Sequence, residues 1–193
     1  MPEMIRILCE GLATVLFTLI CTRFLCKNMK KRDFRFVPWL PYVLTGCGSA
    51  TLFLLGGLSP WTFCGIAFLF VLLYASVQDH STHEADDILS VMMLISEATV
   101  LSQLLGAAIV GGAQMLIALC GKKRMGIGGA DIKLSTAAAL LLGFYKGAIG
   151  FMLGLLIAVV AQLIIAHRKK EQRTQSFALL PYLSVGLWIG FMV

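Results

Sequence analysis

The chain has 193 residues, of which 59% are hydrophobic and 13% are charged, and its formal net charge is +6 at pH 7. This composition excludes an ordinary soluble domain and is typical of a protein that crosses a membrane several times. The positive charge does not indicate nucleic-acid binding, because most basic residues lie directly beside apolar runs, in segments 27–35, 122–124 and 168–173. Basic segments in such positions are typical of cytoplasmic loops.

The apolar runs predict an all-α membrane protein with about eight spans, organised as one integral membrane domain over residues 1–193. The spans are separated by basic, polar or proline-containing turns, with the least distinct turn at 96–98. The expected spans are Ile5–Cys26, Val37–Leu58, Trp61–Gln78, one beginning near Asp87, Leu101–Cys120, Asp131 to about Lys146, Gly147–Ala166 and Phe177–Val193.

Two aspartates stand at ends of these expected spans. Asp79 follows the third span and is expected to end its helix, whereas Asp131 is expected to begin the sixth. An ionisable residue at the edge of a membrane span is costly and is therefore a functional-site candidate. With eight spans, the rule that positive loops stay inside puts both aspartates and all three basic segments on the cytoplasmic side, and both termini outside.

Small residues precede the second aspartate. Gly128, Gly129 and Ala130 come directly before Asp131, and Lys133 follows it. Glycine allows the backbone to bend where a side chain would clash. This run of small residues, aspartate and lysine beside apolar sequence is a fairly specific motif.

The pattern resembles the type IV prepilin peptidases, a branch of the GxGD aspartyl proteases. The second catalytic aspartate of that family lies in Gly-x-Gly-Asp-x-Lys-Leu, and this chain has Gly-Gly-Ala-Asp-Ile-Lys-Leu over 128–134. The chain departs from the family in two places. Ala130 replaces the second motif glycine, and Ala85-Asp86-Asp87 stands where the family has Ile-Pro-Asn or Ile-Pro-Asp. The resemblance extends from about Phe63 to the C-terminus.

This resemblance implies an aspartic endopeptidase in the inner or plasma membrane, with Asp79 and Asp131 as catalytic residues and no cofactor. Its substrates would be type IV prepilins or pseudopilins, whose basic leader is cut at the cytoplasmic membrane face. The chain resembles a short form, without the N-terminal zinc-binding and methylating domain of long members. The lipid bilayer is the other expected partner, and the oligomeric state stays open.

The chemistry of two close carboxyl groups agrees with this implication. They can share one proton because both cannot ionise cheaply at short range, so one activates water while the other donates a proton. Which aspartate holds the proton is left open, since the pair titrates as a unit. Lys133 either lies near Asp131 or faces the lipid headgroups.

Two other functions are compatible with the sequence. Transporters also carry intramembrane aspartates, which would then form an ion or proton pathway. The chain could also be a non-catalytic membrane subunit of a pilus or secretion machine. A metal site is not expected, because the six cysteines form no Cys-x-x-Cys pair and His80 and His83 are expected in a solvated loop.

Two further features concern the helices. The segment 132–144 has 13 residues, which as a helix spans about 20 Å against a hydrocarbon core of about 30 Å.

The tripeptide Leu-Pro-Tyr occurs at 40–42 and again at 180–182, each time at the start of an apolar run. Proline is tolerated in the first turn of a helix, so both copies are expected to open one.

Overall fold

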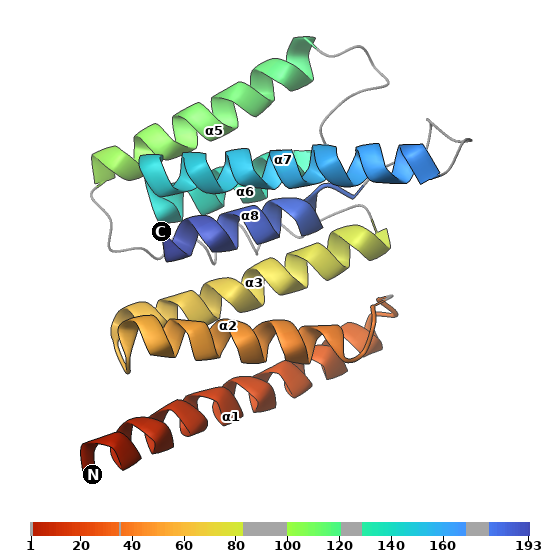
Figure 1. Cartoon of the computed structure of the whole chain (residues 1–193). Coiled ribbons are helices and arrows are strands. Elements are labelled where there is room, and N and C mark those ends of the chain that lie inside the picture. The colour runs from red at the N-terminus through yellow and green to blue at the C-terminus, as the bar shows by residue number, and fades with distance from the viewer. Residues whose placement is uncertain (1, 35, 83–99, 121–128, 169–177) are drawn as a thin grey trace. The chain divides into compact units, whose positions relative to one another are not determined.

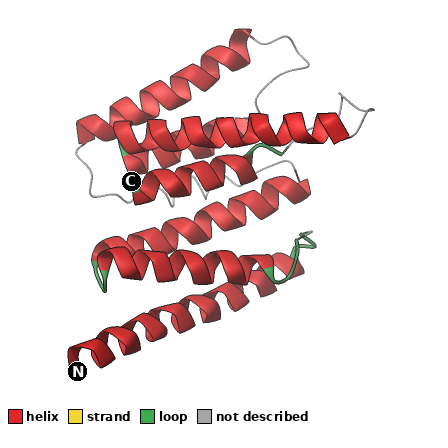
Figure 2. Ribbon diagram, viewed as in Figure 1, coloured by secondary structure: helices red, strands yellow, loops and turns green. Residues whose placement is uncertain are grey.

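The computed structural model describes residues 2–34, 36–82, 100–120, 129–168 and 178–193. The regular structure of these residues is α-helical, which confirms the predicted helical class (Figures 1 and 2). The helices are α1 (Pro2–Lys31), α2 (Leu40–Gly56), α3 (Pro60–Thr82), α5 (Val100–Cys120), α6 (Gly129–Leu142), α7 (Phe144–Arg168) and α8 (Leu180–Met192).

The chain divides into two compact units, residues 1–77 and 78–193. The first contains α1, α2 and most of α3, whereas the second contains the last turns of α3 together with α5 to α8. Both candidate aspartates belong to the second unit. The predicted span that begins near Asp87, and the turn at 96–98, lie outside the described residues.

In the first unit, α1 and α2 run antiparallel and share a buried polar contact. The hydroxyls of Thr22 and Thr45 are 2.8 Å apart, and both side chains are fully buried. Each hydroxyl also lies 2.8 Å from a carbonyl oxygen four residues back in its own helix. This pattern satisfies polar groups inside an apolar contact, where an unpaired hydroxyl would be costly.

Helix α3 continues past the point where the sequence predicted its end. The apolar run stops at Val77, but the helix extends to Thr82, whose hydroxyl donates to the carbonyl of Gln78 at 3.0 Å. The expectation that Asp79 ends its helix is therefore wrong, because the helix continues past Asp79 through Thr82. A change from apolar to polar side chains marks where an apolar surface stops, and backbone hydrogen bonding can continue beyond it.

In the second unit, α5 and α6 form an antiparallel pair. Gly111 of α5 faces Thr136 of α6, and nearer the α5 N-terminus Gly106 faces Ala139. A Cβ atom at Gly106 would lie 2.7 Å from the carbonyl oxygen of Ala139. The two backbones can approach this closely only because glycine has no side chain.

The turn after α6 comes earlier than predicted. Helix α6 ends at Leu142, Gly143 has a φ of 78°, and α7 begins at Phe144 rather than at Gly147. Glycine adopts such a positive φ at little cost, so the helix ends there although the apolar run continues to Tyr145. The expected shortness of this helix is confirmed, since α6 has 14 residues.

Helices α7 and α8 are held together by paired glycines. Gly150 and Gly154 of α7 face Gly186 and Gly190 of α8. A Cβ atom at Gly190 would lie 2.8 Å from the Cα atom of Gly150. Both helices therefore carry a Gly-x-x-x-Gly motif, which lets membrane helices pack backbone against backbone. Since Gly154 also meets Leu183, nearer the start of α8, the pair is antiparallel.

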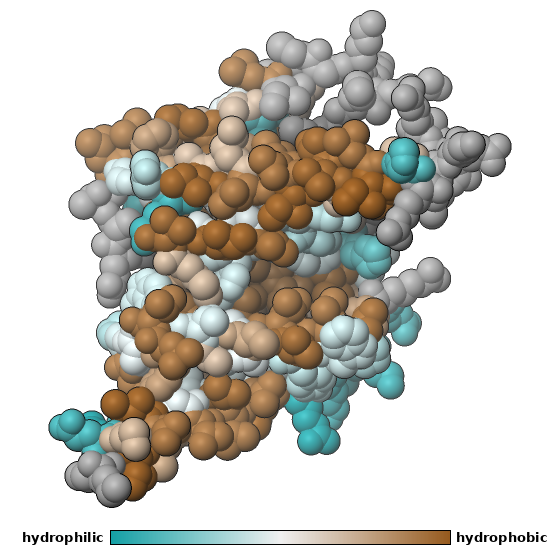
Figure 3. Space-filling model, viewed as in Figure 1, coloured by the Kyte–Doolittle hydropathy of each residue, from teal (hydrophilic) through white to brown (hydrophobic). Residues whose placement is uncertain are grey.

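Several helices have the length and apolar surface of membrane spans. Three are long and apolar enough to cross a bilayer, namely Glu3–Lys31, Pro60–Thr82 and Phe144–His167, and 40–56, 101–116 and 180–192 are shorter apolar helices. Large apolar side chains are exposed along their outer faces, which the hydrophobic surface in Figure 3 displays. Such exposure is normal for lipid-facing helices and excludes an ordinary soluble protein. The protein is therefore a helical membrane protein.

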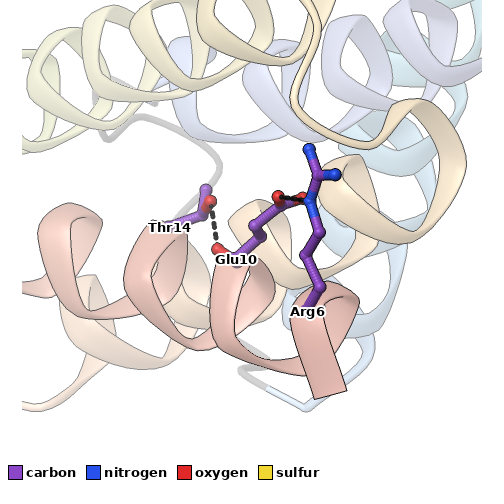
Figure 4. A network of polar contacts seen from close by, with 3 residues as sticks. All are labelled: Arg6, Glu10 and Thr14. Atoms are coloured by element: carbon purple, nitrogen blue, oxygen red, sulfur yellow. Dashed lines mark hydrogen bonds and ion pairs between the residues drawn. The ribbon is translucent and has the colours of Figure 1, made fainter. Parts of the chain in front are cut away.

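The charged residues near the start of α1 are paired locally. Arg6 donates to Glu10 at 2.8 Å, and the Thr14 hydroxyl donates to the Glu10 backbone carbonyl at 2.8 Å (Figure 4). These contacts join residues four apart on one helix face. Pairing lowers the cost of placing two charges within an apolar helix.

Candidate active site

Asp79 is buried near the C-terminal end of α3, with 5% of its surface exposed. Its Oδ2 atom accepts a hydrogen bond of 3.2 Å from the backbone amide of Leu180, the first residue of α8. The preceding residue, Leu179, provides no side-chain cap for this helix. First-turn amides have no partner within their own helix, and a carboxylate is a favoured acceptor for them. Asp79 thus serves as a cap for α8 from 101 residues away in sequence.

Asp131 is buried in the first turn of α6, with 7% of its surface exposed. An acidic side chain in the first turn interacts favourably with the positive end of the helix dipole. Lys133 is exposed, and side chains two residues apart do not face each other on a helix. The position of Lys133 relative to the Asp131 carboxyl group stays a prediction.

The helix pairings put the first turns of α6 and α8 at the same end of the second unit. Helix α6 turns back into α7 at Gly143, and Gly147 packs on Ala139, so these two helices are antiparallel. Helix α8 is antiparallel to α7 through Gly150 and Gly190. Helices α6 and α8 therefore run in the same direction and contact each other. Since Asp131 lies in the first turn of α6 and Asp79 caps the first turn of α8, both carboxyl groups lie toward that end.

Two polar residues beside this site were not anticipated from the sequence. Gln114 of α5 donates to the hydroxyl of Ser135 at 2.7 Å, and that hydroxyl donates to the backbone carbonyl of Asp131 at 2.6 Å. A glutamine inside an apolar helix was the available signal, because polar side chains within membrane spans are rare and usually have a role. The capping amide of Leu180 was signalled only by the repeated Leu-Pro-Tyr, which opens α2 and α8 as predicted.

Part of the predicted motif lies outside the described residues. This applies to Gly128, to the side chain of Ala130, and to His83 and the segment 84–87. Gly129 is described and begins α6, with open space where a Cβ atom would lie. His80 is exposed on the last turn of α3 rather than in a loop. Among the residues that the structure describes, no three His, Cys, Asp or Glu side chains gather as metal ligands would.

The fold and the site define a class of protein. It is a helical membrane protein with two aspartates buried toward one end of its second helical unit. The sequence model of the type IV leader peptidase family matches residues 66–167, which is more than half of the chain and includes both aspartates. The chain belongs to the type IV leader peptidase family. Comparisons with curated proteins and with solved structures give no match.

Proposed function

We propose that the protein is an aspartic endopeptidase that removes the leader peptide of type IV prepilins or pseudopilins, with Asp79 and Asp131 as its catalytic pair. Membership of a peptidase family supports hydrolysis of a peptide bond. The observation that carries the assignment to these residues is that both carboxyl groups are buried toward the same end of one helical unit.

The proposed reaction uses one carboxylate and one carboxylic acid. The carboxylate takes a proton from water while the water oxygen attacks the scissile carbonyl carbon, and the acid donates its proton to the carbonyl oxygen. This forms a gem-diol intermediate. The C–N bond then breaks as the newly protonated carboxyl delivers its proton to the leaving amine, and the other carboxyl regains a proton from the diol. The pair ends with one shared proton, as it began.

Basic segments beside the end of the second unit that holds the aspartates support a cytoplasmic active site. Helix α5 ends at Cys120, just before the basic segment 122–124, and α7 ends at Arg168, where the basic segment 168–173 begins. Antiparallel pairing puts these two helix ends beside the starts of α6 and α8. Basic segments next to membrane spans are retained on the cytoplasmic side. The proposal therefore includes eight spans, with the aspartates toward the cytoplasm.

This topology predicts the labelling of three engineered cysteines. In a background without the native cysteines, residues placed at Lys30, Arg124 and Lys169 are expected to react only with a membrane-permeant thiol reagent in intact cells. The reason is that all three basic segments face inward. A cysteine at Glu3, near the start of α1, is the control and should react with an impermeant reagent. Impermeant labelling at any of the three basic positions would contradict the topology.

Cleavage is expected to be independent of added metal, because a carboxyl pair activates water without one. Purified protein should cleave at the same rate, within about twofold, after treatment with a strong chelator. A zinc-dependent peptidase assayed in parallel provides the control for effective chelation. Loss of cleavage that zinc restores would contradict a carboxyl-pair mechanism.

Co-expression with candidate prepilins tests the proposed substrate class. Loss of a basic leader should increase the gel mobility of the pilin only when the active protein is present. A pilin whose leader-cleavage site is altered serves as the control and should stay unprocessed. Failure to process any prepilin from the source genome would favour a transport or non-catalytic role.

A further inference from the structure

A buried side-chain bridge connects α5 to the first turn of α6. Gln114 and Ser135 are each 1% exposed. The Gln114 Nε2 atom lies 2.7 Å from Ser135 Oγ, which in turn lies 2.6 Å from the backbone oxygen of Asp131. A serine hydroxyl has one proton to donate and can accept others. The hydroxyl also lies 2.9 Å from Gln114 Oε1, so both polar atoms of the glutamine side chain contact it. The contacts thus connect the glutamine amide group, through the serine hydroxyl, to the Asp131 carbonyl.

The bridge lies toward the Asp131 end of the contact between the two helices, which elsewhere includes small residues. Toward the other end, Gly106 and Gly111 of α5 pack closely on α6, with Ala139 and Thr136 as their neighbours. Close packing of small residues lets the two helix backbones approach each other. A hydrogen bond adds a contact of definite geometry, which restrains the rotation of α6 and its shift along the axis, and Gln114 provides one at the Asp131 end.

We propose that Gln114 and Ser135 are positioning residues, which fix the rotation and height of the first turn of α6 and so place the Asp131 carboxyl group for catalysis. Neither residue needs to touch the substrate. The role rests on the proposed function, since it assumes that Asp131 is catalytic. It adds two residues, one of them on a different helix, that the motif around Asp131 does not include.

The expected effect is on the rate of the chemical step. A displacement of a catalytic group by about 1 Å can cost on the order of a hundredfold in rate. Removal of the bridge leaves the packed glycines in place, so we expect kcat to fall at least about tenfold with KM changed by less than about twofold. The Ser135→Ala and Gln114→Leu variants should be similar, and their combination no worse, because each alone breaks the same chain of hydrogen bonds.

A control is available near the other end of α5. Ser102 of α5 accepts an exposed hydrogen bond of 3.2 Å from the backbone amide of Phe144, the first residue of α7. Ser102→Ala also removes a serine hydroxyl that joins α5 to a neighbouring helix, but far from Asp131. It should leave kcat within about twofold of the original protein.

The experiment compares five proteins: the original protein, Ser135→Ala, Gln114→Leu, the double variant and Ser102→Ala. For each, it measures kcat and KM on a prepilin that the original protein cleaves. It also measures the thermal unfolding midpoint and amide hydrogen exchange over 131–135. The proposal expects a fall in kcat and faster exchange over 131–135 in the bridge variants, and neither in Ser102→Ala. Equal kcat in Ser135→Ala and the original protein would overturn it, as would parallel losses of kcat and thermal stability in Ser135→Ala and Ser102→Ala.

Failure of the proposed function would look different. In that case the original protein would cleave no prepilin, or Asp131→Asn would cleave as well as the original. The rate of amide hydrogen exchange over 131–135 would then be the measurement that tests whether the bridge holds the first turn of α6 in place. Unchanged exchange over 131–135 in Ser135→Ala would overturn the positioning role.

Discussion

Replacement of either Asp79 or Asp131 by asparagine is expected to abolish leader cleavage, with a loss of about a thousandfold or more in kcat/KM. An amide can neither take a proton from water nor donate one to a carbonyl oxygen as a carboxyl group does. The two carboxyl groups act as a unit, so the double variant should be no less active than either single one. The measurement is the initial rate of leader loss by purified protein in detergent or vesicles.

The control for these variants is another Asp-to-Asn change on the same chain. Asp33 is exposed in the segment between α1 and α2 and has a φ of 56°. Asparagine adopts positive φ at least as readily as aspartate, so Asp33→Asn should preserve folding and activity. Substantial cleavage by Asp79→Asn or Asp131→Asn would exclude the paired-carboxyl mechanism and leave an ion pathway as the better reading of two buried aspartates.

Gly186→Leu is expected to cause the largest loss of stability. Gly186 lies at the centre of the α7–α8 contact, where a Cβ atom alone would overlap the backbone of Gly150 and Gly154. Backbone atoms cannot move aside as the end of a flexible side chain can, so the helices must separate. Overpacking typically costs about 1–3 kcal/mol, and a leucine against two backbones should reach or exceed the upper end. Activity should fall as well, because α8 carries the amide that Asp79 caps.

Gly112→Leu is the matched control for this variant. Gly112 lies in the middle of α5, and a Cβ atom there would meet nothing within 4 Å. Leucine also favours the helical state over glycine, so stability should stay within about 0.5 kcal/mol or increase. The measurement is the unfolding midpoint in detergent, followed by loss of the monodisperse peak. Similar midpoints for the two variants would contradict the close packing of α7 on α8.

The helical class and both aspartates could be predicted because they depend on local patterns. Apolar runs mark membrane helices, and an ionised group beside one is conspicuous. Helix ends were less predictable. Helix α6 stops at Gly143 because of its positive φ, and α3 continues to Thr82 because its backbone bonds continue. Neither cause changes the average hydropathy on which the expected boundaries depended.

The contacts that arrange the site are non-local and were not predicted. Asp79 meets Leu180 across 101 residues, and Gln114 meets Ser135 across 21. Both depend on the packing of whole helices, and glycines on α5, α7 and α8 allow the close packing of α5 on α6 and of α7 on α8. The Gly-x-x-x-Gly spacings in α7 and α8 are visible in the sequence and indicate close helix packing. They do not say which helices meet or in what register, so the environment of each aspartate required the structure.

The central claim is that this protein hydrolyses one peptide bond in a prepilin by means of Asp79 and Asp131. Its most direct test is the intact mass of a purified prepilin after incubation with the purified protein in lipid vesicles. The account predicts two products whose masses sum to that of the prepilin plus one water, with the cut directly before the apolar helix of the pilin. It predicts neither product with Asp131→Asn. An unchanged prepilin mass with well-folded original protein, or the same two products with Asp131→Asn, would contradict the account.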